Sequence, residues 1–242
     1  MDAIQTLSLT KKYKDVTAVS ELNLTVEKGE LFSLRGVNGA GKTTTIKMLS
    51  GLTAPTSGDA LLGGKSVVHH PEDVKSIIGV SPQETAVAPG LTVKENLQLI
   101  CGVHGFGKKE TTARITELTG LLGLDTVLHK KAGKLSGGWQ RRLSIAMALV
   151  SNPEILFLDE PTLGLDVLAR SDLWDIIRSL KGRVTIILTT HYLEEAEALS
   201  DRIAIMKDGK LLICATADEI KATAGSDRFE EAFLQIVKGA GK

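Results

Sequence analysis

The alternation of apolar and polar positions predicts two kinds of strand in this chain. Residues 3–9 and 18–27 alternate between apolar and polar side chains, which is typical of half-buried antiparallel strands. Shorter runs are almost uniformly apolar, as strands buried on both faces are. Helical stretches separate these runs, and this order predicts an α/β fold with a mostly parallel sheet. The uniformly apolar runs occur at 31–35, 77–80, 155–158, 184–188 and 202–206.

The segment from about 86 to 150 has a different pattern. It shows helical periodicity and several glycine breaks, without a convincing strand. We therefore expect a helical insertion between two strands of the sheet. Elsewhere the pattern predicts helices at 43–50 and 139–150, and a short strand at 210–214 that is followed by two small helices.

We predict that residues 1–242 form a single domain with three parts. The core of the fold is expected at 1–85 and 151–215, and the helical subdomain at about 86–150. The short C-terminal helices are expected within 216–242.

The charge balance and the cysteine content exclude several classes of protein. The chain has 29 Lys and Arg residues against 29 Asp and Glu residues, so it carries no basic excess that would indicate a nucleic-acid partner. With 43% of its residues apolar, it can form a substantial core and is not expected to be disordered. Cys101 and Cys214 are too few for a disulfide framework or a cysteine zinc site. No apolar run is long enough to span a membrane, and no signal peptide is visible, so we expect a soluble, cytoplasmic chain.

The segment Gly36–Thr43 matches the phosphate-loop pattern G-x-x-x-x-G-K-[ST]. Its glycines allow backbone N–H groups to turn toward phosphate oxygens, and the helix predicted after it adds the positive end of its dipole. The Lys42 ammonium would reach the β- and γ-phosphates, and the Thr43 hydroxyl would ligate Mg²⁺. Its position between a predicted strand and a predicted helix favours nucleotide binding over a chance match. The residues expected to hold the nucleotide here are Asn38, Gly39, Ala40, Gly41, Lys42, Thr43 and Thr44.

Two carboxylates follow the buried strand predicted at 155–158. Asp159 and Glu160 emerge at the carboxyl end of this strand, which is where α/β sheets bind their ligands. Asp159 suits an outer contact to Mg²⁺, and Glu160 could polarise an attacking water molecule. Acidic residues in this position can also simply cap the next helix. The phosphate loop in the same chain favours the catalytic interpretation.

The segment Leu135-Ser136-Gly137-Gly138 provides a second helix start with anion-binding character. Ser136 is a good N-cap, and the two glycines expose backbone N–H groups. A capped helix start explains the same residues without a ligand. If the segment does bind phosphate, it can share one phosphate chain with Gly36–Thr43 only where the two meet, within one chain or between two.

Three further residues complete the candidate site, although each is a weak signal alone. Gln83 follows the strand predicted at 77–80 and could reach the metal or the attacking water. His191 follows the strand predicted at 184–188 and could hold the γ-phosphate, although a histidine there is more often structural. Tyr13 precedes the phosphate loop and could stack on adenine, although an isolated tyrosine is more often packing.

Together these motifs resemble those of the ATP-binding cassette (ABC) ATPases, in the family's order and over nearly the whole chain. The signature LSGG followed by a Walker B strand with a trailing glutamate is specific to this family. The resemblance implies an α/β P-loop NTPase core with a mostly parallel sheet, an antiparallel β subdomain and a helical insertion. The matching segments are Walker A at 36–43, the glutamine loop at Gln83, the signature at 135–138, Walker B at 155–160, the D-loop at 163–166 and the switch histidine at His191.

The resemblance also implies ATP and Mg²⁺ as cofactors, and ATP hydrolysis as the activity. It assigns the catalysis to Glu160, His191, Gln83 and Lys42, and the metal to Thr43, Gln83 and Asp159. Two cassettes would form a head-to-tail dimer, either a homodimer or a pair with a second ATPase subunit, with each ATP between Walker A of one protomer and the signature of the other. The residues implied on the signature side are Ser136, Gly137, Gly138 and, in the D-loop, Asp166. Val37, Trp139 and Val167 depart from the family's usual residues without removing a group that touches nucleotide or metal.

The segments TTHYLEEAE (189–197), EPTLGLD (160–166) and SDRIAIMKDGKL (200–211) resemble the ATPase subunits of exporters. Such a subunit would be peripheral on the cytoplasmic face of the membrane through a transmembrane permease, whose short helix would dock on an exposed apolar stretch after Gln83, at 86–91. An importer subunit remains the alternative. A ribosome- or DNA-acting relative is disfavoured, because there is one cassette and no long coiled coil, and a small-molecule P-loop kinase would have no use for LSGG.

Overall fold

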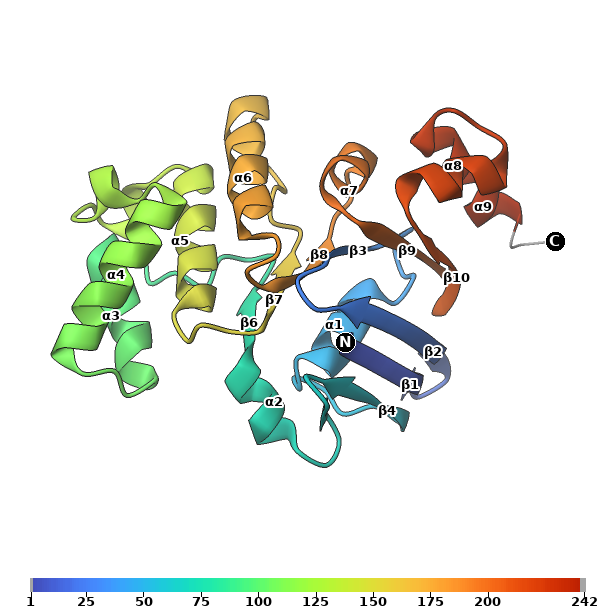
Figure 1. Cartoon of the computed structure of the whole chain (residues 1–242), viewed down its shortest axis with the longest axis horizontal. Helices are drawn as coiled ribbons and strands as arrows, with labels where there is room; N and C mark the ends of the chain where they lie inside the picture. The colour runs from blue at the N-terminus through green and yellow to red at the C-terminus, as the bar shows by residue number, and fades with distance from the viewer. Residues whose placement is uncertain (1, 240–242) are drawn as a thin grey trace.

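Ten strands in two sheets carry the fold within residues 2–239, which are the residues that the computed structural model describes. The larger sheet has six strands in the order β10-β9-β3-β8-β7-β6, and all neighbouring pairs are parallel except β9 with β10. Figure 1 shows this sheet crossing the middle of the molecule. Its strands are β3 (Leu31–Gly36), β6 (Ile78–Ser81), β7 (Ile155–Asp159), β8 (Thr185–Thr189), β9 (Arg202–Lys207) and β10 (Lys210–Ala215).

The smaller sheet is antiparallel and has the order β2-β1-β4-β5. It lies below the parallel sheet in the view of Figure 1. The long strands β1 and β2 alternate buried and exposed positions over much of their length, because one face packs on the core and the other meets solvent. Its strands are β1 (Asp2–Tyr13), β2 (Val16–Glu27), β4 (Ser57–Leu62) and β5 (Lys65–Ser66).

The central strands of the parallel sheet are buried on both faces. In β7, Ile155 and Phe157 belong to one hydrophobic cluster, and Leu156 and Leu158 belong to another. Helix α1 (Lys42–Leu49) contributes to the first cluster together with residues of both sheets. The uniform hydrophobicity of 155–158 therefore has a direct cause, since neither face of this strand meets water.

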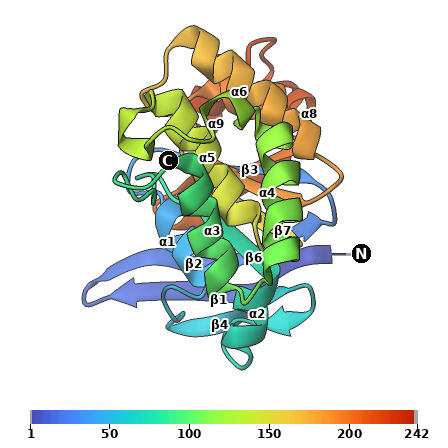
Figure 2. The ribbon, with the colours of Figure 1, turned by 90° about the vertical axis from the view of Figure 1, so that its left-hand side faces the viewer.

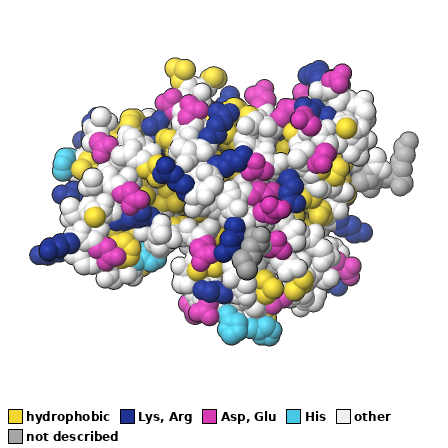
Figure 3. All heavy atoms as spheres, viewed as in Figure 1, with side chains coloured by type: hydrophobic (Ala, Val, Ile, Leu, Met, Phe, Trp, Pro, Cys, Tyr) yellow, Lys and Arg dark blue, Asp and Glu magenta, His cyan; other side chains and the backbone are white. Residues whose placement is uncertain are grey.

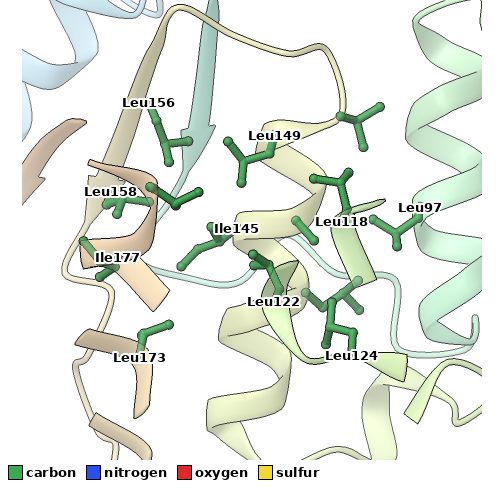
Figure 4. Close-up of a cluster of buried hydrophobic side chains, with 14 of the residues drawn as sticks. Leu97, Leu118, Leu122, Leu124, Ile145, Leu149, Leu156, Leu158, Leu173 and Ile177 are labelled. Carbon is green, nitrogen blue, oxygen red and sulfur yellow. The ribbon is translucent and has the colours of Figure 1, made fainter. Parts of the chain in front are cut away.

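Helices fill the connection between β6 and β7. Helix α3 (Val93–Val103) begins with a capping box between Thr92 and Glu95, and it is followed by α4 (Lys108–Leu122) and α5 (Gly137–Leu149). Leucines and isoleucines of these helices, of α6 (Val167–Leu180) and of β7 point into one apolar cluster in Figure 4. Figure 2 shows α3 and α4 facing the viewer, with the antiparallel sheet beneath them.

The C-terminal part of the chain packs beside β9 and β10. Helix α7 (Leu193–Leu199) precedes β9, and α8 (Ala217–Ala224) and α9 (Phe229–Gly239) follow β10 at the far right of Figure 1. Buried apolar residues of α7, β9, α8 and α9 form a third cluster, which includes Phe229 and Phe233. The C-terminal helices are therefore part of the packed fold.

The predicted fold class is confirmed, with boundaries that move by a few residues. The strand expected at 77–80 occupies 78–81, because Ile77 ends helix α2 (Pro71–Ile77), which the sequence pattern missed along with β4. No helix among the described residues is long and apolar enough to cross a membrane. Figure 3 shows basic and acidic side chains interspersed over the face in view.

Candidate nucleotide-binding site

The candidate residues meet because they follow neighbouring parallel strands. Strand β3 leads into the phosphate loop, β8 leads to His191, β7 leads to Glu160, and β6 leads to Gln83. These four strands are adjacent in the sheet, in the order β3-β8-β7-β6. Since all are parallel, their carboxyl ends lie at one edge, which is the ligand-binding edge of α/β sheets. The chain thus brings together segments that lie far apart in the sequence (Figure 1).

The phosphate loop is shaped by Gly41, which precedes helix α1. Its φ is 100° and its ψ is 0°, in the region that L side chains rarely adopt. A Cβ atom at this position would lie 2.4 Å from the carbonyl oxygen of Ala18 in β2. The first N–H groups of a helix have no partners within the helix, and no side chain caps them at the start of α1. Such a helix start can hold a phosphate.

Lys42 folds back over this loop. Its side chain is 7% exposed, and its Nζ donates to the carbonyl oxygens of Gly36 at 2.8 Å and Val37 at 3.2 Å. Burial lowers the pKa of Lys42, and the nearby cation of Arg35 lowers it further by a smaller amount. The Glu160 carboxylate opposes this effect. None of the ion pairs among the described residues involves Lys42. Its charge is therefore available to an anionic ligand.

Glu160 and His191 form a contacting pair. The Oε2 atom of Glu160 accepts from the backbone N–H of His191 at 2.8 Å, and Oε1 lies 3.2 Å from Nε2 of the imidazole. Glu160 is 4% exposed, and burial raises the pKa of its carboxyl despite the hydrogen bond from His191. The pKa of His191 is lowered by its partial burial and by the cations of Lys42 and Arg35. A carboxylate with a raised pKa is a better proton acceptor than an ordinary one, which suits a general base.

The backbone at Glu160 is held in a conformation that needs support. Its φ is 49°, which is uncommon for a residue with a Cβ atom. The Glu160 N–H donates to both the carbonyl and the hydroxyl oxygen of Thr189, each at 3.1 Å. Such conformations persist where surrounding contacts fix them, and they cluster at functional sites. Strand β8 thus fixes the backbone of Glu160, the residue that follows β7.

The residues proposed for a metal present oxygen ligands. Thr43 and Gln83 line the cavity described below, whereas Asp159 is not among its lining residues. The Asp159 carboxylate accepts a hydrogen bond from the Thr189 hydroxyl. Gln83 is exposed, and its backbone carbonyl accepts from Arg141 of α5 at 2.6 Å, as does that of Pro82. The sequence analysis did not identify Arg141. The cue that it offered is an arginine on the inner side of α5, the helix that begins at the LSGG signature.

A cavity of about 440 Å³ joins the phosphate loop to the catalytic candidates. Tyr13 lies at its edge with 45% exposure, and the Lys11 ammonium is 5.0 Å from the centre of its ring. Val16 and Thr17 also line it and were missed, because hairpin residues carry no motif. The predicted residues in the lining are Tyr13, Asn38, Gly39, Ala40, Gly41, Lys42, Thr43, Thr44, Gln83, Glu160 and His191.

The signature and the D-loop lie outside this cavity and next to each other. A Cβ atom at Gly138 would be 3.2 Å from the Ala169 methyl group of α6, and one at Gly137 would be 3.5 Å from the Leu165 side chain. Ser136 occupies the N-cap position of α5, but its hydroxyl makes no capping bond, contrary to the capped start that the sequence suggested. Asp166 instead caps α6, where its Oδ1 accepts from the Ala169 N–H at 2.9 Å.

The segment 86–91 is partly exposed: Ala86 and Pro89 are exposed, and Val87, Ala88 and Leu91 are half-buried. Val87 is half-buried and packs on the main hydrophobic cluster. The backbone of Ala88 is held by the Asn96 side chain, which accepts from its N–H at 2.8 Å and donates to its carbonyl at 3.2 Å. The expected apolar stretch is therefore exposed at Ala86 and Pro89, whereas Val87 packs on the helical insertion.

The fold and the site together define a P-loop nucleotide-binding protein with a second, outward-facing glycine-rich helix start. The chain belongs to the ABC transporter family, whose sequence profile it matches over residues 19–163. This result confirms the family resemblance seen in the motifs.

Individual relatives agree with this assignment. The chain is 38% identical over 241 residues to the probable multidrug ABC transporter ATP-binding protein YbhF of Escherichia coli K12, which covers 97% of this chain but 41% of the relative's length. It is 41% identical over 221 residues to the daunorubicin resistance ATP-binding protein DrrA3 of Streptomyces coeruleorubidus, covering 91% of this chain and 70% of that protein. The chain thus spans less than half the length of YbhF.

Solved structures give the same fold. The ATP-binding subunit of an ABC transporter superposes with a TM-score of 0.85 at 28% identity, covering 97% of this chain and 99% of the other. The ATP-binding cassette MJ0796, solved as a dimer in a post-hydrolysis state with ADP and Pi, superposes with a TM-score of 0.77 at 27% identity. That comparison covers 88% of this chain and 98% of the cassette.

Proposed function

We propose that this chain is the ATP-binding and ATP-hydrolysing subunit of an ABC exporter. The observation that carries the proposal is the Glu160–His191 pair, which shares one cavity with the phosphate loop. Export is supported by the relatives, whose names include multidrug, daunorubicin resistance and, in Burkholderia thailandensis at 42% identity, Nod factor export proteins.

In this proposal the phosphate loop and α1 bind the phosphates of ATP. The N–H groups of the loop surround the phosphate oxygens, and Lys42 moves from its carbonyl acceptors to the β- and γ-phosphates. Tyr13, at the edge of the same cavity, stacks on the adenine ring. Gly41 matters because a side chain there would enter the space of Ala18.

Glu160 acts as the general base and His191 orients it. The carboxylate accepts a proton from the attacking water, and its raised pKa improves that transfer. The imidazole, held by the 3.2 Å contact to Oε1, is free to donate to the γ-phosphate once a nucleotide separates the pair. Gln83 lines the same cavity and would help to place the water.

The oxygen-rich ligand set of Thr43, Gln83 and Asp159 fits Mg²⁺. Hydroxyl, amide and carboxylate oxygens, together with phosphate oxygens, are what Mg²⁺ prefers. The metal supplies neutralisation of the phosphate charge when it is bound. Asp159 is already oriented by the Thr189 hydroxyl.

We further propose that two copies, or one copy and a second ATPase subunit, close around ATP head to tail. The signature of one chain, Ser136 to Gly138, would complete the site of the other, since it lies outside the chain's own cavity. Leu163, Val167 and Leu168, beside the signature, are 40%, 70% and 78% exposed and would be covered by this closure. The chain would lie at the cytoplasmic face of the membrane on a transmembrane permease, which would use the closing motion for export.

The Glu160→Gln variant tests the catalytic assignment. The amide cannot accept the proton from water, so we expect ATP hydrolysis to fall by about 10²- to 10⁴-fold while ATP still binds. Glu154→Gln, at the opposite end of the same strand, is the matched control because its carboxyl is exposed and distant from the loop. Release of phosphate and binding of a fluorescent ATP analogue are measured for both variants.

Three outcomes would contradict this assignment. Normal hydrolysis by Glu160→Gln would show that Glu160 is not the general base. Loss of hydrolysis together with loss of ATP binding would point to a structural role for Glu160. Equal effects in Glu154→Gln would show that the assay reports on folding and not on the site.

A further inference from the structure

Arg35 is a buried cation that none of the motifs explains. It lies in β3 directly before the phosphate loop, in a strand that is otherwise apolar apart from Ser33, and it is 8% exposed. Burying a guanidinium is unfavourable unless its hydrogen bonds and charge are satisfied. Its Nε is buried and has no hydrogen-bond partner among the described residues. The contacts that it does make therefore call for a reason.

Two contacts of Arg35 point in different directions. Its Nη1 donates to the carbonyl oxygen of Thr190 at 2.6 Å. Its guanidinium carbon lies 5.1 Å from the centre of the Phe233 ring in α9, within the range of a cation–π interaction. One side chain thus joins the C-terminal helix to the backbone immediately before His191.

Thr190 is held at its other polar group as well. It is fully buried, and its hydroxyl accepts from the N–H of Tyr192, the N-cap residue of α7, at 3.0 Å. Glu195 of α7 accepts from the Thr162 hydroxyl at 3.1 Å and from the Trp174 indole N–H at 2.9 Å. The backbone on one side of His191 is therefore fixed from β3 and from α7, while the His191 N–H itself binds Glu160.

We propose that Arg35 is a positioning residue for His191, and that Phe233 makes the C-terminal helix α9 part of the catalytic arrangement. The inference rests on the roles of Glu160 and His191 proposed above. Phe233 supports the guanidinium, the guanidinium holds the Thr190 carbonyl, and that carbonyl sets where the His191 N–H and imidazole meet Glu160. A shift of α9 would reach the reaction through these contacts, without any contact between α9 and the nucleotide.

Paired variants in α9 separate positioning from packing. Phe233→Leu keeps an apolar side chain of similar reach but removes the aromatic face from Arg35. Phe229→Leu makes the same change in the same helix and the same cluster, and Phe229 takes part in no cation–ring contact among the described residues. Arg35→Met removes the hydrogen bond to Thr190, and Arg35→Lys keeps a donor and the charge.

The full-length chain is assayed for kcat and KM of ATP hydrolysis and for amide exchange of the 188–193 peptide. We expect Phe233→Leu and Arg35→Met to lower kcat by about tenfold, below the roughly 10²-fold effect of a 1 Å misplacement, with KM nearly unchanged. The 188–193 peptide should exchange faster in both. Arg35→Lys should recover part of kcat, and Phe229→Leu should leave kcat and exchange at wild-type values.

Two results would overturn the inference. Equal kcat for Phe233→Leu and Phe229→Leu would show that α9 contributes packing alone, and this comparison holds even where Arg35→Met does not fold. Unchanged exchange of the 188–193 peptide in Phe233→Leu would show that the ring does not act through Thr190. Wild type and Glu160→Gln run beside them: if these two hydrolyse ATP equally, the proposed function fails and the inference falls with it.

Discussion

Replacing Gly41 by alanine should disturb the phosphate loop, because it combines a steric clash with a left-handed backbone conformation. The new Cβ would lie 2.4 Å from the Ala18 carbonyl oxygen and 3.1 Å from Cγ2 of Val19, and both residues belong to β2. Strand β2 cannot retreat easily, because it is paired with β1 along most of its length. The loop must therefore move.

The expected cost combines two effects. A left-handed backbone conformation costs an L residue about 1–2 kcal/mol. Forcing a methyl group into filled space adds about 1–3 kcal/mol, so the total is about 2–5 kcal/mol. The chain should still fold, since domains are stable by about 5–15 kcal/mol. Gly39→Ala is the control: its φ is 79° but no atom lies within 4 Å of the new methyl, so about 1–2 kcal/mol is expected.

Urea unfolding of both variants measures these free energies, and titration with a fluorescent ATP analogue measures binding. Gly41→Ala should be destabilised more than Gly39→Ala and should bind the analogue at least ~10-fold more weakly, which corresponds to about 1.4 kcal/mol. Equal destabilisation of the two variants would refute the steric argument. Wild-type binding by Gly41→Ala would show that the loop adapts without loss.

Two further predictions concern buried charges. Burial raises the pKa of Glu195, and a carboxyl with a raised folded-state pKa destabilises the fold as pH rises from its ordinary value of 4.5 through the folded-state value. Glu195→Gln should therefore gain stability relative to wild type over that window, by at most about 1.4 kcal/mol per pH unit. A difference in unfolding free energy between the two chains that stays constant from pH 4.5 to 8 would refute this. Arg141→Met should lower the unfolding free energy by about 1.5–3 kcal/mol, because it leaves the carbonyls of Pro82 and Gln83 without their charged donor. Arg141→Lys cannot bridge both carbonyls, so its unfolding free energy should lie between those of wild type and Arg141→Met. Equal stability of these three chains in urea would show that the Arg141 hydrogen bonds do not stabilise the fold.

The ends of the buried strands were predictable from the sequence. The apolar runs before Gly36, Asp159 and His191 identify strands, and the parallel arrangement places their following residues together. Strand β4 was missed, because SGDALL begins with turn-forming residues and becomes a strand by pairing with β1. Its structure depends on a distant partner, which local pattern does not contain.

The contacts that shape the site were less predictable than its members. The links from Arg35 to Phe233 and from Arg141 to Gln83 join segments whose spacing carries no periodic signal. Val87 was expected to be exposed, yet packing of the helical insertion covers much of it. Tertiary packing decides such cases, so the sequence identifies the candidate site residues better than it identifies the residues that hold them in place.

Mixing two variants tests most directly whether the ATP site is shared between two chains, as proposed above. Lys42→Ala removes the phosphate-loop charge, and Ser136→Arg places bulk at the exposed signature without altering the chain's own loop. Each variant alone should hydrolyse ATP far more slowly than wild type. A heterodimer of the two has one site with both lesions and one intact site, so the mixture should recover ATP hydrolysis as heterodimers form. If Ser136→Arg alone retains normal hydrolysis, or if no ratio of the two variants restores any activity, the site is not shared between chains.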